Sequence, residues 1–439
     1  MNVQLGAIAR GDAYKNKVFA LIQDFEAEGR IEEFIRVVVK DKPKSPALVV
    51  VKKEFAGILE VDRIAAFGDG VLHIDLTQID SAHIFLSYFW DAPNSPNRVE
   101  RSLLQLPKEI EEDENPLAKA RILYDWLNGS EKILSVSNQT ILALALPEAL
   151  SDYPWESLHL IDQKLLPLRW FKRSVAFAEP KNRPLSVLFM AAQPNGVETQ
   201  LDCEQQETKI LEGTKRYPLN LVVEESGWLD ELRAIFDHQQ HDFDLLHLTG
   251  VVDSHKGKAC LLTEDEFGEC CYSSAEDVAT AIGSPFPKLI LLCAEAEYSW
   301  GQYELWRDLI SQGGEAIVTF GNEGSEALIS RLYQDLARGE TLGSAWRQIY
   351  RSAYRQERSL RSSFTLHLAD TELLSRALVT RGQKPHAHFS NETTFRDEAG
   401  NMKVSDRYNF VGRRRQLQNC LKALKIDTDK IGVILHGMG

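Results

Sequence analysis

A histidine and a cysteine lie near the ends of two apolar segments, and together they could perform the chemistry of a cysteine peptidase. His247 lies in the run D-L-L-H-L-T-G, and Cys293 lies in the run L-I-L-L-C-A. In such an enzyme an imidazole accepts the thiol proton, and the resulting thiolate attacks a carbonyl carbon. The sequence therefore raises the hypothesis of a His247/Cys293 dyad, and the elements that carry these residues decide whether they can meet.

Both segments are predicted to be buried strands of a parallel sheet. Residues 243–250 and 288–294 are short apolar runs bounded by helical or turn-rich sequence, which is the pattern of strands covered on both faces. Open α/β sheets keep their chemistry at the carboxyl ends of such strands. We therefore expect Gly250 and Ala294 to lie side by side at that edge. On the second strand, Cys293 would face the same side as Glu295 and lie about 6–7 Å before it along the strand.

The two segments resemble the CHAT family of caspase-like domains. In that family the first segment usually reads H-x-x-G-H-G and carries the general base in its second histidine, and the later strand ends in N-A-C and carries the nucleophile. Residues 247–250 match the first half of this motif, but Val251 and Val252 follow in place of His-Gly. Glu295 occupies the nucleophile position. Valine cannot accept a proton, and a carboxylate is a poor substitute for a thiolate. The resemblance therefore implies a caspase-like fold without peptidase chemistry.

Alternatives remain for the residues that could still react. Cys293 and His247 form either a displaced dyad or a small core residue and a hydrogen-bonded histidine at a strand end, since free cysteine is among the most often buried residue types. His255 is close enough in sequence to supply a base. The pair Cys270-Cys271 is predicted to lie in a hairpin strand, where successive side chains face opposite sides, and this favours packing over metal binding. We expect no metal and no cofactor.

Alternating strands and helices predict an α/β fold, with a mostly parallel sheet and helices on both faces. The predicted strands of this unit are at 186–194, 219–224, 243–250, 288–294 and 315–320, and 363–370 is expected to be a last edge strand. A Pro-Trp-Glu segment after an earlier strand is again typical of CHAT domains, which extends the resemblance over roughly 68–370. Within it, Trp155 is expected to be a buried packing anchor and Glu156 a hydrogen-bonded structural residue.

A small helical module is predicted over residues 1–60. Apolar residues recur at helical spacing before a helix-ending Gly29. They are Val18, Leu21, Ile22 and Phe25. The text V-F-A-L-I-Q-D-F-E-A-E-G-R-I-E-E-F-I resembles the second half of a bacterial effector-associated domain, an adaptor that pairs with copies of itself on other proteins. The resemblance implies protein partners bound through homotypic contacts, and an ordinary helical cap on the following domain is the alternative.

The C-terminal part changes character twice. Residues 371–406 are mostly polar and lack periodicity, which predicts a linker. The text F-V-G-R-R-R and then I-G-V-I-L-H-G-M-G, within 407–439, resembles the start of a STAND-type (NB-ARC-like) NTPase. Gly437 would be the first glycine of a phosphate loop whose lysine and hydroxyl residue do not follow. We expect a fragment of a larger protein or a truncated gene product, with ATP bound only by a longer parent.

Composition narrows the function classes. A net charge of −14 argues against a surface for nucleic acid or for an anionic membrane. The six cysteines contain no C-x-x-C pair, and no apolar run approaches the length of about 20 residues that spans a bilayer, so a reduced, cytoplasmic protein is expected. The expected function is a non-catalytic caspase-like (pseudo-peptidase) signalling domain of a bacterial STAND-type conflict or signal-transduction protein. The alternative is a CHAT-type cysteine endopeptidase that oligomerisation activates through the displaced dyad.

Overall fold

The computed structural model describes residues 70–380, apart from short gaps, together with Cys420. The gaps are 80–82, 92–99, 106, 108–109, 111–114, 130–131, 137–138, 177, 200–202, 215–216, 218, 297–298, 322–325 and 356–363. The helical module predicted over 1–60 lies outside the described residues. So do the greater part of the predicted linker and all of the predicted NTPase start except Cys420.

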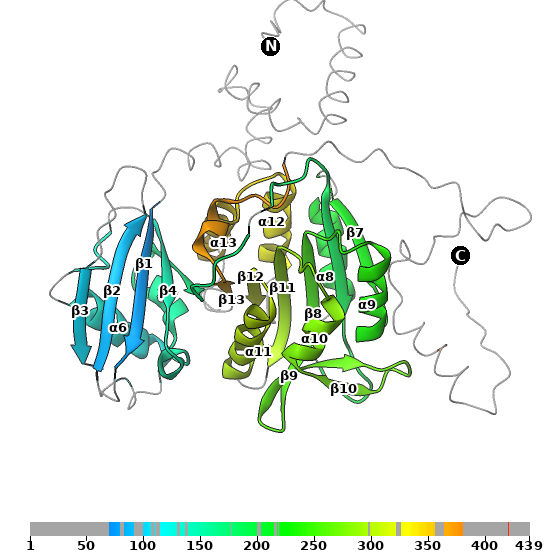
Figure 1. Cartoon of the computed structure of the whole chain (residues 1–439), viewed down its shortest axis with the longest axis horizontal. Helices are drawn as coiled ribbons and strands as arrows, with labels where there is room; N and C mark the ends of the chain where they lie inside the picture. The colour runs from blue at the N-terminus through cyan, green and yellow to red at the C-terminus, as the bar shows by residue number, and fades with distance from the viewer. Residues whose placement is uncertain are drawn as a thin grey trace, which may run out of the picture.

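The strands join in one 13-stranded sheet (Figure 1). They are β1 (Val71–Gln78), β2 (His83–Asp91), β3 (Glu100–Gln105), β4 (Thr140–Ala145), β5 (Leu165–Trp170), β6 (Leu185–Ala191), β7 (Leu219–Glu224), β8 (Leu245–His255), β9 (Lys258–Glu264), β10 (Cys270–Ser273), β11 (Leu289–Ala296), β12 (Ala316–Phe320) and β13 (Phe364–Leu368). Their main path runs β10-β9-β8-β11-β12-β13-β5-β4-β1-β2-β3, and β6 pairs with both β7 and β8. Seven of the twelve pairings are parallel, so the predicted mostly parallel sheet is confirmed.

Eight α-helices and three short 3-10 helices complete the described part. They are α6 (Pro116–Asn128), α7 (Leu158–Ile161), α8 (Cys203–Thr214), α9 (Leu229–His238), α10 (Ala275–Ile282), α11 (Ser299–Gln312), α12 (Glu326–Ala337), α13 (Leu342–Arg355), η2 (Glu148–Leu150), η3 (Trp155–Ser157) and η5 (Thr371–Ser375). Local signals explain their ends. Ser274 and Asp277 form a capping box at the start of α10, and Gly283, with φ 72°, follows its last residue.

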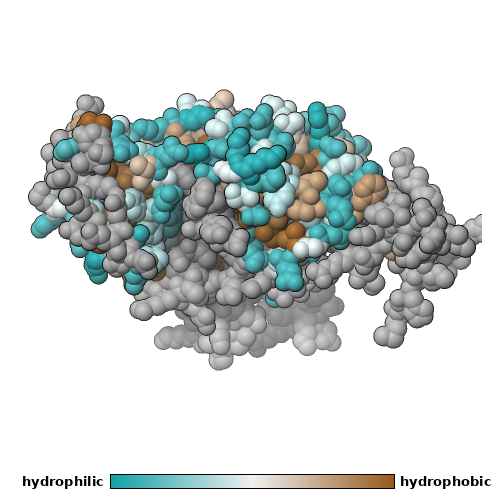
Figure 2. All heavy atoms as spheres, turned by 90° about the horizontal axis from the view of Figure 1, so that it is seen from below, coloured by the Kyte–Doolittle hydropathy of each residue, from teal (hydrophilic) through white to brown (hydrophobic). Residues whose placement is uncertain are grey.

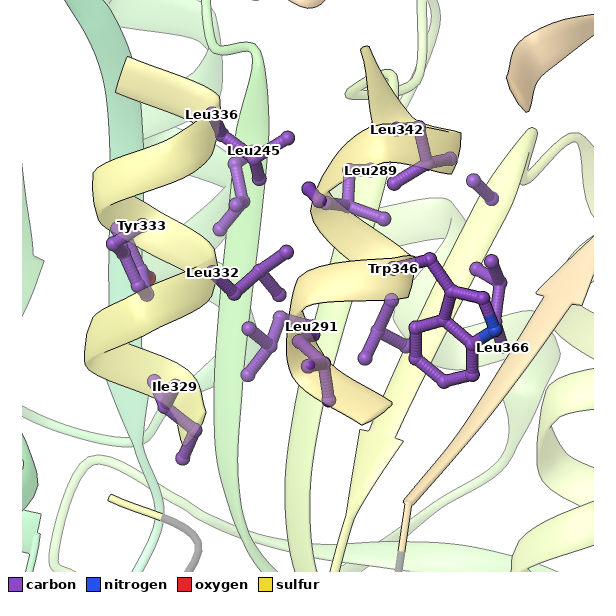
Figure 3. Close-up of a cluster of buried hydrophobic side chains, with 14 of the residues drawn as sticks. Leu245, Leu289, Leu291, Ile329, Leu332, Tyr333, Leu336, Leu342, Trp346 and Leu366 are labelled. Carbon is purple, nitrogen blue, oxygen red and sulfur yellow. The ribbon is translucent and has the colours of Figure 1, made fainter. Parts of the chain in front are cut away.

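Helices cover both faces of the parallel strands β7-β6-β8-β11-β12. This order is that of a doubly wound sheet and is consistent with a caspase-like α/β fold. Side chains of α8, α12 and α13 pack on one face, and those of α9, α10 and α11 pack on the other. Figure 3 shows the first of these layers, in which Leu332 of α12 and Trp346 of α13 lie over strand residues such as Leu291. The alternation in β11 divides its side chains between the two layers.

The earlier strands form a second apolar core beneath α6 and α7. Trp155 is fully buried there, and its indole N–H donates to the Leu150 carbonyl at 2.7 Å, so the predicted packing anchor is confirmed. Glu156 accepts two hydrogen bonds from Arg169, at 2.6 and 3.0 Å. Arg169 also donates to the carbonyl oxygens of Ser151 and Tyr153. The structural role predicted for Glu156 therefore rests on a partner thirteen residues away in sequence.

The prediction of an edge strand at 363–370 is wrong. β13 lies inside the sheet, antiparallel to β12 on one side and parallel to β5 on the other. The contact with β5 consists of two residue pairs, His367 with Arg169 and Leu368 with Trp170. The packed part also continues past residue 370, because η5 buries Leu373 and Leu374 and a bridge joins Val379 to Lys181.

Polar side chains cover much of the described surface in the view of Figure 2, with small apolar areas between them. Few large apolar side chains are strongly exposed among the described residues. They are Ile79, Leu117, Leu211 and Tyr272. Among the helices of the described part, none has both the length and the apolar character that a membrane span requires.

Candidate functional site at the carboxyl edge of β8 and β11

The two strands that carry the candidate residues are neighbours in the sheet. In the parallel β8–β11 ladder Gly250 pairs with Ala294, which confirms the predicted adjacency. The ladder does not stop there, because Val251 pairs with Glu295 and Val252 with Ala296. β8 continues as far as His255 and forms a hairpin with β9. The two residues that the resemblance aligns with a general base and a nucleophile are thus paired strand residues.

His247 lies inside the sheet rather than at its edge. Its side chain is completely buried, and its Nδ1 lies 2.9 Å from the hydroxyl oxygen of Tyr333 on α12. The Phe189 ring meets the imidazole edge-on, with the two ring centroids 4.8 Å apart. Within the described part of the chain, Nε2 is buried and has no hydrogen-bond partner. Burial lowers the pKa of His247 to about 3, so the imidazole is neutral near pH 7.

Cys293 is buried on the same side of the sheet. It is 1% exposed and belongs to the apolar layer beneath α12 and α13. Its register partner in β8 is Thr249, whereas His247 pairs with Leu291. Strand spacing and rise then place the Cα atoms of Cys293 and His247 about 8 Å apart. Burial, and to a smaller extent the neighbouring Cys203, raise the pKa of the Cys293 thiol well above its ordinary value. A peptide substrate could reach this thiol only if the layer above it opened.

Tyr333 is the contact of His247 that the sequence reasoning missed. It is fully buried, and burial raises the pKa of its hydroxyl well above the ordinary value. The hydroxyl therefore keeps its proton and satisfies Nδ1 of His247 as a structural hydrogen bond. The helical spacing of Ile329, Leu332 and Leu336 predicts the apolar face of α12, but a tyrosine in that stripe gives no signal of its polar partner.

Glu295 holds a loop at this edge of the sheet. Its carboxylate accepts a hydrogen bond from the hydroxyl of Thr199 at 2.8 Å. The same loop, which follows β6, is tied at its other end to the β9–β10 hairpin. There the backbone N–H of Gln193 donates to the Glu264 carboxylate at 2.8 Å, and the N–H of Asn195 donates to the Gly268 carbonyl at 2.8 Å. The two carboxylates therefore serve as anchors for backbone and hydroxyl groups.

Close packing explains why residue 250 is a glycine. A Cβ added at Gly250 would lie 3.2 Å from the carbonyl oxygen of Ala192, at the start of the same loop. That distance is tighter than ordinary contact with a backbone atom, so a side chain at Gly250 would push the loop away. The glycine thus permits the loop to lie against the strand ends.

The other candidate residues lie apart from this edge. His255, at the end of β8, stacks on Tyr272 of β10 with the ring centroids 4.4 Å apart. Cys271 is exposed, whereas Cys270 is partly buried, so the packing role predicted for this pair does not extend to Cys271. Among the described residues no cluster of three or more histidine, cysteine, aspartate or glutamate side chains could hold a metal ion.

Comparisons with known proteins identify no family for this chain. No protein-family model matches the chain, and none of the curated proteins matches it either. The evidence on function is therefore the strand register and the burial of the candidate side chains.

Proposed function

We propose that this chain is a non-catalytic caspase-like (pseudo-peptidase) interaction domain of a bacterial STAND-type conflict or signal-transduction protein. The observation that supports it most is the pairing of Val251 with Glu295 at the edge where base and nucleophile would lie. Neither side chain can perform the step that its position would require. Glu295 is instead engaged by Thr199.

The state of the nearest reactive groups supports the same proposal. Acyl transfer by a cysteine needs a thiolate that substrate can reach and an imidazole at hydrogen-bond distance from it. Cys293 is buried, and the pKa of its thiol is raised. His247 is also buried, and the pKa of its imidazole is lowered. Both shifts favour the neutral forms, so no thiolate–imidazolium pair is stabilised.

The partners in this proposal are proteins. The module predicted over residues 1–60 would bind copies of itself on other chains, and the part predicted to follow residue 407 would bind ATP only in a longer parent. The net charge of −14 fits an assembly without nucleic acid or an anionic membrane, in the cytoplasm.

A covalent peptide-based probe for cysteine peptidases tests the absence of catalysis. The full chain, in a Cys271→Ser background that removes an exposed thiol, is incubated with the probe and mapped by mass spectrometry. We expect no labelling of Cys293. Labelling of Cys293 that is lost in His247→Ala, with an unchanged circular dichroism spectrum, would overturn the proposal and establish the displaced dyad as the reactive centre.

Sedimentation of the full chain tests the adaptor part. We expect reversible self-association that Leu21→Glu weakens, because a charge on the predicted apolar stripe opposes pairing. The matched control is Glu26→Gln in the same predicted helix, which changes a charge without adding one to the stripe. Equal association of all three chains would contradict homotypic pairing through this module.

A further inference from the structure

A slot lies in the sheet where β4 ends before its two neighbours do. The last pair of β1 with β4 is Asp75 with Ala145, and the last pair of β4 with β5 is Leu144 with Arg169. β1 continues to Gln78, paired only with β2, and β5 continues to Trp170 beside β13. The slot is a cavity of about 340 Å³, lined by residues 75–78, 144–147 and 169–172. Its two flanking strands are separated by two strand spacings, about 9–10 Å.

The slot and the pair Val251–Glu295 lie at opposite ends of the strands, on the two sides of the sheet to which their carboxyl ends point. β13 runs antiparallel to β12 and parallel to β5, so the carboxyl ends of β5, β4 and β1 lie on the side where β11 and β12 begin. A ligand in the slot is therefore independent of the pseudo-peptidase edge. Its size falls in the range of ligand-binding pockets, roughly 300–1,000 Å³.

Backbone groups of both flanking strands face the slot. Alternate residues of a strand direct their N–H and C=O groups to the same side. The N–H of Phe171, directly after β5, donates to the Leu368 carbonyl of β13, so the carbonyl of its neighbour Trp170 faces away from β13, towards the slot. In β1 the N–H of Ile79 donates towards β2, which turns the carbonyl of Leu76 to the slot.

The sequence ends β4 at this point for a specific reason. The residue that would next meet the Leu76 carbonyl in the parallel register is Pro147, which has no N–H. The chain of β4 then turns into η2 and leaves the sheet. The ladder is thus interrupted, although β1 continues to Gln78 and β5 to Trp170.

The charges of the slot cancel in pairs. Lys172 reaches across the mouth and forms hydrogen bonds of 2.8 and 2.9 Å to the Asp75 carboxylate on β1. Arg169 is held by Glu156. Lys172 adopts φ 54°, a left-handed conformation that is uncommon for a side chain other than glycine. Apart from Thr77 and Gln78, the remaining lining is apolar and includes Leu146 and Phe171. A ligand that complements this slot has uncharged apolar side chains and its own backbone donors and acceptors.

We infer that the slot binds an extended, uncharged peptide segment of a partner protein as an added strand between β1 and β5. Hydrogen bonds to the carbonyls of Trp170 and Leu76 supply the pairing, and apolar side chains of the segment fill the space above the end of β4. The Lys172–Asp75 pair closes the mouth over the bound segment.

Fluorescence anisotropy with two blocked pentapeptides tests this site. Both have the order Thr-Leu-Thr-Leu-Thr, and one carries N-methyl groups on the leucine amides, which removes donors but keeps the apolar side chains. We expect saturable binding of the first peptide to the full chain and binding of the N-methylated peptide weaker by about tenfold or more. Hydrogen exchange of the wild-type chain should slow within residues 76–78 and 170–172 when the first peptide is present.

Two matched protein variants locate the binding. Thr77→Trp fills the slot from an exposed position of β1, and Asn220→Trp adds the same side chain at an exposed position of the edge strand β7. We expect a loss of about tenfold or more only in Thr77→Trp. Equal binding of the two peptides, equal effects of the two variants, no saturable binding at millimolar peptide, or unchanged hydrogen exchange at the slot would overturn the inference. The exchange result on the wild-type chain decides the matter if a variant does not fold.

Discussion

Glu295 lies opposite Val251 in the parallel ladder of β8 and β11, and its carboxylate accepts a hydrogen bond from Thr199. At this edge of the doubly wound sheet, the strand ends are therefore hydrogen-bonded to a neighbouring loop. This loop, which follows β6, is anchored at both ends by carboxylates.

The burial of Cys293 predicts that its thiol reacts slowly. Iodoacetamide near neutral pH should modify Cys271 and leave Cys293 unmodified. Burial raises the pKa of both thiols, but Cys271 is exposed, whereas Cys293 is fully buried and its thiol pKa is raised well above the ordinary value. Peptide mapping after timed quenching measures both sites in the same sample. Urea should remove the difference by unfolding the chain. Rapid alkylation of Cys293 in the native chain would contradict its burial.

The neutral histidines predict a loss of stability in acid. The pKa values of His247 and His367 are lowered by burial to about 3, whereas an unfolded histidine has a pKa near 6.5. Between pH 6.5 and 3 the unfolded state therefore binds more protons, and the free energy of unfolding falls as pH falls. Each histidine contributes at most about 1.4 kcal/mol per pH unit.

Urea titrations of the wild type and His247→Phe from pH 7 to 4 measure this dependence. The variant should show the shallower loss of stability with decreasing pH, because phenylalanine binds no proton. His255→Phe, at a partly exposed histidine, is the control and should keep a steeper slope than His247→Phe. Parallel curves for the wild type and His247→Phe would mean that His247 titrates similarly in both states.

The buried ion pair predicts a strong effect at Glu156. Glu156→Gln should lower the free energy of unfolding by about 3 kcal/mol, because the side chain of Arg169 is only 7% exposed and would lose its anionic partner. Glu148→Gln is the matched control, since it breaks an exposed pair with Arg307 and should change stability by less than about 1 kcal/mol. Chemical denaturation compares the two variants, and equal effects would show that the burial of Arg169 is unimportant.

The close contact between Gly343 and the backbone of Leu374 predicts that a side chain at residue 343 loosens residues 371–380. A Cβ at this position would lie 2.8 Å from the backbone carbonyl oxygen of Leu374, so Gly343→Ala must displace η5. We expect faster hydrogen exchange and earlier proteolysis in residues 371–380 of this variant. Ser352→Ala in the same helix, α13, is the control and should leave the segment unchanged. Identical exchange in both variants would show that η5 is not packed on the start of α13.

Much of the fold could be predicted because buried strands and capped helices leave local signals. The continuous apolar runs predict β8 and β11 as covered strands, and Ser274 and Gly283 mark both ends of α10. That Val251 and Glu295 are neither histidine nor cysteine could also be read from the sequence, because it depends on residue types alone.

The remaining features depend on contacts between distant segments. β13 gives the pattern of a strand, but its place inside the sheet depends on two pairs with β5, about two hundred residues earlier in the chain. The partners Tyr333 of His247 and Thr199 of Glu295 likewise lie 86 and 96 residues from them. No local period encodes such pairs, so the sequence could predict the candidate residues but not their environment.

The interior position of β13 also limits how copies of this protein can assemble. A strand at the end of a sheet offers open backbone groups that another chain can extend. Here β5 occupies that side of β13, so a continuous sheet across two molecules cannot grow from it. Within the described part, the strands left with one bonded side are β3, β7 and β10. Extension of the sheet from one copy to the next would thus have to begin at β3, β7 or β10.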